Sequence, residues 1–239
     1  MKFRSLVVLV AALMTTALTA RLGYWQLERA QQKRALQAQT NARAAMPALD
    51  ARQWPIDAAQ LDALKHRRVQ LAGHWLAEHA VLLDNRPMQG RTGFYLVMPL
   101  QLDDGSVVLV QRGWLPRNFS ERSRVTVPTA QPGRVELSGR LAPRLPRLYE
   151  FEPTTSGLIR QNLDVAAFAI ETRLPLRPGA LIQDGSSDHS SDGLLRLWSA
   201  PDTGVQKHHG YAFQWFSLSL LTLGLYVWFQ IIRPRRRPR

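Results

Sequence analysis

The sequence predicts a membrane protein in which two transmembrane helices flank a mainly antiparallel β domain of the α+β class. Apolar stretches lie near both ends of the 239-residue chain, and short β-rich runs separated by turn residues fill its middle. We place the boundaries at 1–5 for a cytoplasmic N-terminus, 6–26 for the first helix, 27–207 for a periplasmic β-rich domain, 208–232 for the second helix and 233–239 for a basic cytoplasmic tail.

The second membrane helix has the clearer signal. From Tyr211 to Ile232 the chain runs for 22 residues without a charged side chain. A helix of that length, at 1.5 Å per residue, crosses a hydrocarbon core of about 30 Å. Five arginines lie in the seven residues that follow, and arginine just beyond a span marks the cytoplasmic side. We therefore expect His208 and His209 at the non-cytoplasmic mouth of this helix.

The first apolar stretch, Leu6–Ala20, has two interpretations. A short basic start, an apolar run and the small residues of Ala17–Ala20 also describe a cleavable signal peptide. Alternatively the helix continues to Leu27, with the Arg21 side chain reaching the interface and Trp25 in the aromatic belt. We favour the uncleaved anchor, because a hairpin of two spans then puts both chain ends on the cytoplasmic side.

Charge and cysteine content limit the classes of function that this chain could have. The net charge of +13, from 31 basic and 18 acidic residues, raises the question of a nucleic-acid partner. Seven of the basic residues flank the two membrane segments, and the remaining 24 are interspersed with the 18 acids. The excess therefore reflects topology, and we expect no nucleic-acid binding. The absence of cysteine excludes disulfides, thiolate ligands and thiol catalysis.

The middle region begins with helices and continues with strands. Glu28–Ala45 lacks Gly and Pro and predicts a helix continuing out of the membrane, and Asp57–Lys65 predicts a short helix with Asp57 as its N-cap. A third helix is expected at Asp164–Glu171, and a loop at Gly185–Gly193. Strands are expected at Val69–Trp75, Ala80–Asp84, Gly93–Leu100, Val107–Trp114, Val135–Leu141, Leu158–Asn162 and Ala180–Gln183. Short strands at this spacing favour an antiparallel barrel or sandwich.

Conventional catalytic motifs are missing from the sequence. It contains no nucleophile elbow, P-loop, dinucleotide fingerprint or zinc-protease motif. His66, His74, His79 and His189 are scattered, and we expect surface or hydrogen-bonded side chains there. Asp103 and Asp104 stand beside Gly105 between two β-rich runs, which predicts a hairpin turn rather than a carboxylate pair. A membrane-anchored periplasmic enzyme is therefore the least favoured class of function.

His208 is the strongest candidate for chemistry. Helical spacing puts Tyr211 and Trp215 on its face, and a hairpin would bring Trp25 and Gln26 to the same membrane depth. A neutral imidazole is a common axial ligand of haem iron, and aromatic rings suit a macrocycle. The alternative is an interfacial histidine among the aromatic residues that are enriched at membrane surfaces.

The chain resembles the surfeit-locus family of cytochrome c oxidase assembly proteins over nearly its full length. The motifs that carry the resemblance are Gly23-Tyr-Trp-Gln-Leu-Glu-Arg29, Leu83-Asp-Asn-Arg-Pro87 before Gly90-Arg-Thr-Gly-Phe-Tyr-Leu-Val-Met-Pro-Leu100, Asp104-Gly-Ser-Val-Val-Leu-Val-Gln-Arg-Gly-Trp114 and His208-His-Gly-Tyr-Ala-Phe-Gln-Trp215. The resemblance implies two spans around a large outward-facing domain, haem a as the cofactor and a role in maturing the haem-copper subunit of the oxidase.

The resemblance also assigns residues. His208, three before the tyrosine of His-x-x-Tyr-Ala, matches the candidate iron ligand, with His209 as a second imidazole beside it. Gln206 and Lys207 stand where the family often has asparagines. The first motif brings in Trp25, Gln26 and Arg29, for which membrane anchoring is as good an interpretation as cofactor contact. The stretch from Asp104 to Trp114 contains Arg112, Gly113 and Trp114. There we expect Trp114 in the core and Gly113 at a bulge or close backbone approach. The sequence indicates no chemical role for Arg86.

Two hypotheses follow. In the first, the protein is an inner-membrane assembly factor, without catalysis of its own, that binds haem a at the periplasmic face and assists its insertion. His208 would be the metal ligand, and Tyr211, Trp215, Trp25 and Gln26 would line the cofactor site. In the second, it is a scaffold that binds the nascent oxidase subunit or other assembly proteins without cofactor. The expected partners are the membrane and the oxidase catalytic subunit, with haem a synthase as a further candidate.

Overall fold

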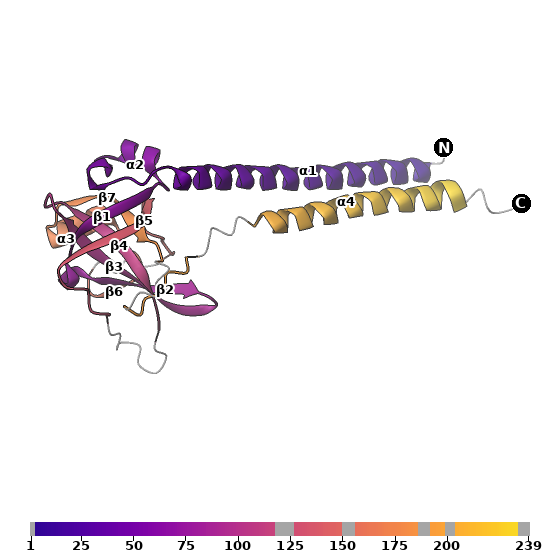
Figure 1. Cartoon of the computed structure of the whole chain (residues 1–239). Coiled ribbons are helices and arrows are strands. Elements are labelled where there is room, and N and C mark those ends of the chain that lie inside the picture. The colour runs from indigo at the N-terminus through magenta and orange to yellow at the C-terminus, as the bar shows by residue number, and fades with distance from the viewer. Residues whose placement is uncertain (1–2, 118–126, 150–155, 186–191, 199–203, 234–239) are drawn as a thin grey trace, which may run out of the picture. The chain divides into compact units, whose positions relative to one another are not determined.

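The computed structural model describes residues 3–117, 127–149, 156–185, 192–198 and 204–233 (Figure 1). The chain divides into two units. The helical unit comprises residues 1–39 and 201–239, and the β unit comprises residues 40–200. Part of the loop expected at Gly185–Gly193, residues 186–191, and the tail from residue 234 lie outside the described residues.

The helical unit is built from two long helices. α1 runs from Phe3 to Ala45, and α4 runs from Val205 to Val227 and continues as a π-helical turn, η3, from Trp228 to Ile232. Both are long and apolar enough to cross a membrane, and only 11% and 0% of their most apolar windows are buried. Core helices of soluble proteins are mostly buried, so this exposure fits helices that face lipid. The two candidate spans at the chain ends agree with the predicted fold class.

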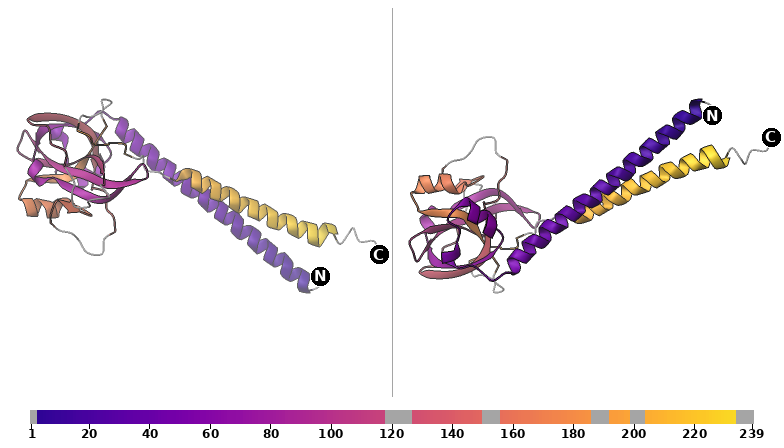
Figure 2. Two further views of the ribbon diagram at one scale, coloured as in Figure 1. Left: turned by 90° about the horizontal axis from the view of Figure 1, so that it is seen from below. Right: turned by 90° about the horizontal axis from the view of Figure 1, so that it is seen from above.

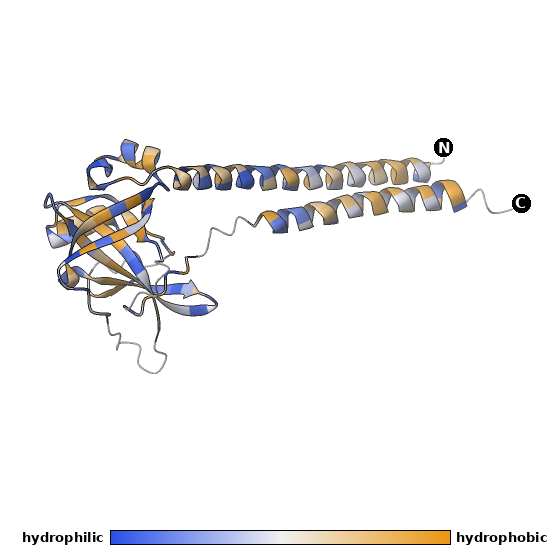
Figure 3. Cartoon of the chain, in the orientation of Figure 1, coloured by the Kyte–Doolittle hydropathy of each residue, from blue (hydrophilic) through white to orange (hydrophobic). Residues whose placement is uncertain are grey.

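The predicted first span and the polar helix after it form a single element. α1 continues for 43 residues without interruption, because nothing between Gly23 and Ala45 breaks a helix, and Pro47 follows its end. Figure 3 shows the hydropathy of α1 changing along its length, from hydrophobic near the N-terminus to hydrophilic towards Ala45.

Small residues form the seam between α1 and α4. The buried positions are Thr19, Gly23 and Ala30 on α1 and Ala212 and Ser219 on α4, at heptad-like spacings of four and seven. Small side chains let helix backbones approach closely in a membrane, where packing and interhelical hydrogen bonds hold helices together. The Ser219 hydroxyl donates to the backbone oxygen of Thr16 at 3.1 Å, which adds such a bond across the seam.

The β unit contains the predicted strands and helices in the expected order. Its elements are η1 Ala51–Gln53, α2 Ala58–Leu64, β1 Arg68–Trp75, η2 Ala77–His79, β2 Val81–Met88, β3 Arg91–Leu102, β4 Val107–Pro116, β5 Arg134–Ala142, β6 Ile159–Arg160, α3 Val165–Thr172 and β7 Leu176–Gln183. Asp57 caps α2 by accepting from the Gln60 amide, as predicted, and Asp164 caps α3 in the same way.

Five strands close into a barrel, and Figure 2 shows the curved strands of this unit from two further sides. The pairing runs β1–β3–β4–β7–β5 and returns to β1, and every pair is antiparallel except β4–β7. Numbered by position among these five strands, the order is 1-2-3-5-4-1 with strands 3 and 5 parallel, which is the topology of the OB fold. β2 and β6 extend the sheet beyond β3. The architecture is therefore the barrel, and not the sandwich, of the two predicted alternatives.

The barrel is filled by alternate residues of its strands. Leu71, Leu100, Val110, Leu137 and Leu181 belong to one buried cluster to which Leu61 of α2 also contributes. Burial of each such side chain stabilises the fold by about 1.5–3 kcal/mol. On β1 and β5 buried and more exposed positions alternate, so the outward residues remain available for contacts at the surface.

The Arg-Gly-Trp segment forms a bulge in β4. Opposite β3 the register passes from Gly113 to Gln111 while β3 advances by one residue, so Arg112 is the additional residue. Trp114 is 1% exposed, which confirms its predicted place in the core. A Cβ atom on Gly113 would lie 2.5 Å from the Leu194 Cβ, so the predicted bulge and the close approach are both present.

Replacing Gly113 with alanine is expected to destabilise the β unit by about 1–3 kcal/mol, because the added methyl group overlaps Leu194. The measurement is the free energy of unfolding of the full chain in detergent, followed by tryptophan fluorescence. Gly185→Ala is the matched control, since its Cβ would meet the nearest atom at an ordinary 3.5 Å. Equal stability of the two variants would contradict the close-approach account.

Candidate functional site

The candidate site lies where α4 begins, beside the middle of α1. The His208 Nδ1–H donates a hydrogen bond to the Gln26 side-chain oxygen at 2.7 Å. Gln26 follows Gly23 by three residues and precedes Ala30 by four, so it occupies the same seam as these two buried positions. The helix seam therefore brings together two of the residues that the sequence assigned to a common membrane depth.

This hydrogen bond selects the tautomer of the neutral His208 ring. With the amide oxygen as acceptor, Nδ1 carries a proton, and in the neutral ring Nε2 keeps its lone pair. Histidines that ligate metals commonly donate their second ring N–H to a protein acceptor, which orients the ring and fixes its tautomer. His208, with its ring oriented by Gln26, thus fits the role of an axial ligand of haem iron, and Nε2 would be the ligating atom.

His209 is in a different state. The Arg34 side chain donates from Nη2 to the His209 Nε2 at 2.8 Å. A guanidinium can only donate, so the bond uses the Nε2 lone pair and leaves the proton on Nδ1. Neither nitrogen of His209 is then available as a ligand while Arg34 is in place. Gln26 and Arg34 therefore place the two adjacent imidazoles, which the sequence left as alternative iron ligands, in different hydrogen-bonding states.

The three aromatic residues predicted for the site lie on the helices that carry it. Trp25 and Tyr211 are about half exposed, and Trp215 is half-buried. In the described residues no hydrogen bond or ring contact joins these three side chains to His208, and their role stays a prediction. A different aromatic pair crosses the seam: the rings of Tyr24 and Phe216 meet edge to face at 6.1 Å. Sequence spacing alone gave no sign of that pair.

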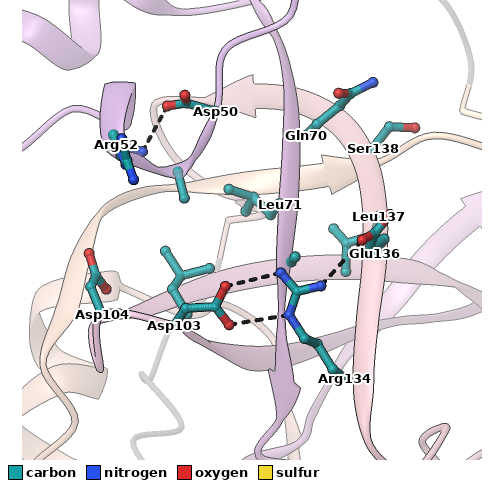
Figure 4. A pocket seen from close by; sticks show the side chains of 13 residues that line it. Asp50, Arg52, Gln70, Leu71, Asp103, Asp104, Arg134, Glu136, Leu137 and Ser138 are labelled. Atoms are coloured by element: carbon teal, nitrogen blue, oxygen red, sulfur yellow. Dashed lines mark hydrogen bonds and ion pairs between the residues drawn. The ribbon is translucent and has the colours of Figure 1, made fainter.

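The β unit has a pocket of its own, with a volume of about 900 Å³ (Figure 4). Residues of η1, β1, β5 and the β3–β4 turn line it. Arg134 donates to both carboxylate oxygens of Asp103, at 3.3 and 3.0 Å, and this hydrogen bonding lowers the pKa of Asp103. The carboxylate is therefore ionised and paired. Such a pocket offers polar contacts to another molecule rather than a general acid or base.

Asp104 is also a turn residue. Its carboxylate accepts from the Ser106 hydroxyl and amide, and these bonds lower the pKa of Asp104. Gly105 adopts a positive φ of 82° in the same turn, as the Asp-Gly pair predicted. Across the described residues no group of three or more His, Asp or Glu side chains could hold a metal ion.

Arg112 of the Arg-Gly-Trp segment is buried in the β unit. Its side chain lies over the Trp75 ring at 4.6 Å and pairs with Asp192 at 3.3 Å. Burial lowers the pKa of Arg112, and the charge of Asp192 opposes that effect. A pocket of about 500 Å³ borders the pair. The contacts of Arg112 described here all lie within the β unit, where they join β4 to β1 and to the segment after β7.

Arg86, for which the sequence indicated no role, is also buried. Its Nη2 donates to the Gln161 backbone oxygen at 2.5 Å and to the Asn162 side chain at 3.3 Å, which ties β2 to the segment after β6. The Trp114 ring N–H in turn donates to the Arg86 backbone oxygen at 2.8 Å. The sequence predicts a turn at Arg86, between two expected strands, whereas the structure places it within β2, and no sequence signal pointed to this network.

The structure is that of a protein with two candidate membrane helices in one unit, an OB-type barrel in the other, and a hydrogen-bonded imidazole near the start of α4. The chain belongs to the SURF1 family, whose model matches residues 13–220. This is a family of cytochrome oxidase assembly factors, and the match confirms the resemblance seen in the motifs.

Curated relatives support the assignment. A SURF1-like protein of Rickettsia felis is 28% identical over 224 residues, which cover 91% of this chain and 94% of the relative. One from Rickettsia bellii is 28% identical, with coverage of 91% and 88%. Surfeit locus protein 1 of Arabidopsis thaliana is 33% identical over 119 residues, or 45% of this chain and 33% of that protein. The Rickettsia relatives are therefore similar along almost their whole length.

We expect the Gln26 side chain to hold His208 in the Nδ1–H tautomer. Nitrogen NMR of the full chain labelled at histidine, at a pH where the ring is neutral, should show Nδ1 protonated and Nε2 unprotonated. Gln26→Leu removes the acceptor and should shift the ring towards the other tautomer. Gln31→Leu, at an exposed position of the same helix, is the control and should leave the signals unchanged. An unaltered tautomer in Gln26→Leu would show that another group positions the ring.

Proposed function

We propose that this protein binds haem a at the outer mouth of its helix pair, with His208 as the iron ligand, and assists insertion of the cofactor into the catalytic subunit of a haem-copper oxidase. The observation that carries the proposal is the hydrogen bond from His208 Nδ1 to Gln26, which leaves the Nε2 lone pair uncommitted. Membership of an oxidase assembly family supports it independently.

Each residue would have a limited task. The bound group would supply an iron centre that accepts an imidazole nitrogen. Gln26 holds the ring in the ligating tautomer, and Arg34 occupies the competing nitrogen of His209. Trp25, Tyr211 and Trp215 would provide apolar surface beside the iron ligand. The proposal assigns no catalytic step to the chain, only binding and release of the cofactor.

We place the protein in the bacterial inner membrane with both termini in the cytoplasm and the β unit in the periplasm. The arginines that follow the second span support this orientation, because positive charge beside a span favours the cytoplasmic side. The proposed partners are the oxidase catalytic subunit, which would receive the cofactor, and haem a synthase, which would supply it.

The pocket of the β unit favours a second candidate function, a scaffold that binds the nascent oxidase subunit without cofactor. At about 900 Å³ it is large enough for a side chain or loop of a partner, and Asp103, Arg134 and Glu136 offer charges of both signs there. In this reading His208 would be an interfacial residue. The two functions differ in one observable, the presence of haem a on the purified protein.

Purified protein, co-expressed with the enzymes that make haem a, is expected to show a reduced haem a spectrum. His208→Ala should lose the spectrum because the iron ligand is removed, and His209→Ala, the adjacent control, should retain it. Circular dichroism must show that both variants are folded.

The outcomes separate the alternatives. A colourless parent, from membranes that contain haem a, would contradict the haem-binding proposal and favour the scaffold. Retention of the spectrum in His208→Ala with its loss in His209→Ala would move the ligand to the neighbouring imidazole.

A further inference from the structure

Positive charge gathers around the candidate ligand. Arg29, Lys33 and Arg34 lie on the turns of α1 beyond Gln26, and Lys207 precedes His208 on α4. The Lys33 Nζ comes within 3.5 Å of the position that a Cβ on Gly204 would occupy, so it reaches the start of α4. The charges of Lys33 and Arg29 are both near enough to act on the His208 ring.

Two of these cations, Arg29 and Arg34, have neutral hydrogen-bond partners within the described residues. Arg29 donates to the Gln32 side-chain oxygen at 3.1 Å, and Arg34 donates to His209. Glu28, the acidic residue of this stretch of α1, pairs instead with Arg21 at 3.9 Å. In the described part of the chain neither Arg29 nor Lys33 forms an ion pair with a carboxylate. Asp202, before α4 in the sequence, lies outside the described residues.

Such a cluster is unfavourable in isolation. Like charges repel, and the repulsion is larger beside a hydrocarbon core than in bulk water because the dielectric constant is lower. An anion between the cations would turn the cost into a favourable interaction, and arginine suits a carboxylate because its planar fork can donate two hydrogen bonds.

We propose that Arg29 and Lys33 bind the carboxylate side chains of the tetrapyrrole whose iron His208 ligates, and so set the orientation of the macrocycle. This inference rests on the proposed function. At 1.5 Å per residue, Arg29 and Lys33 lie about 4.5 and 10 Å beyond Gln26 along α1, on the side away from the first span. A tetrapyrrole of this class carries its carboxylates on one edge, and that edge would face these cations while the apolar edges face the membrane.

Arg34 has a separate task in this arrangement. Its bond to His209 Nε2 withdraws it from the carboxylates and blocks the second imidazole. Arg29 differs, because it donates an exposed hydrogen bond to the neutral Gln32 amide. A carboxylate could replace that amide at little cost in free energy. The same cations could instead contact phospholipid phosphates, which carry the other anionic oxygens available at a membrane surface. The experiment must therefore distinguish tetrapyrrole carboxylates from phospholipid phosphates as the anions that these cations bind.

The test compares haem a with its dimethyl ester, in which both carboxylates are neutral. The full-length apoprotein in phosphatidylcholine nanodiscs is titrated with each form, and the affinity is read from the absorption spectrum. We expect the parent to bind the acid about three- to tenfold more tightly than the ester, as two partly exposed charge pairs would give. Arg29→Gln combined with Lys33→Gln should remove that preference by weakening the acid and leaving the ester unchanged.

Two controls make the result specific. Arg43→Gln removes one positive charge from the last turn of the same helix and should keep the parent preference. The double variant Arg29→Lys with Lys33→Arg keeps both charges and should restore it. A preference that survives the loss of Arg29 and Lys33, or that falls equally in Arg43→Gln, would overturn the inference.

The remaining outcomes are also decisive. A parent that binds acid and ester equally well would overturn this inference while haem binding through His208 stands. A parent that binds neither form would contradict the proposed function itself. If the cations serve lipid phosphates, the acid and ester would bind alike. The variant with both Arg29→Gln and Lys33→Gln would then bind vesicles that contain phosphatidylglycerol more weakly than the parent does, with no change in its affinity for haem a. That result would also overturn the inference.

Discussion

The close approach of α1 and α4 at Gly23 is the constraint on which the candidate site depends. A Cβ on Gly23 would lie 2.8 Å from the Phe216 ring, so a larger side chain there would have to displace that ring from the seam. At the present helix separation Gln26 reaches His208 with a hydrogen bond of 2.7 Å. The bond in turn satisfies the N–H of a half-buried imidazole, so packing and polar contact support each other.

The motifs of the SURF1 family fall into two physical classes in this structure. Gln26 and His208 meet at the seam of the helical unit, where they can act on a ligand. Arg112 and Trp114 lie inside the β unit, where a buried guanidinium is tolerated because Asp192 and the Trp75 ring compensate its charge. Asp192 also pairs with Arg196, so loss of Arg112 would remove one of its two arginine partners together with the contact to Trp75. The phenotype would therefore report on the fold rather than on the cofactor.

Local signals explain what the sequence predicted well. The Asp57 cap and the Asp103–Gly105 turn act within a few residues, so their geometry follows from the residues themselves. Barrel closure does not, because it depends on the pairing of β1 with β3 and on the parallel pair of β4 and β7, both set by tertiary packing. Arg86 likewise depends on Asn162, 76 residues away. Residue spacing predicted that Gln26 and His208 lie at the same depth in the membrane. It did not predict the rotation of the two helices that brings their side chains into hydrogen-bond contact.

The choice between two adjacent imidazoles is made by their neighbours and not by the motif. The amide oxygen of Gln26 accepts a hydrogen bond from the His208 Nδ1–H and leaves the Nε2 lone pair of the neutral ring unused, whereas the Arg34 guanidinium donates a hydrogen bond to the Nε2 lone pair of His209. A carboxylate at position 26 would also accept from His208, but it would bring a negative charge into the helix seam, where desolvation is expensive. The neutral amide provides the same orientation without that cost. An uncharged acceptor is therefore the residue type that physical chemistry favours opposite a ligating histidine at a membrane surface.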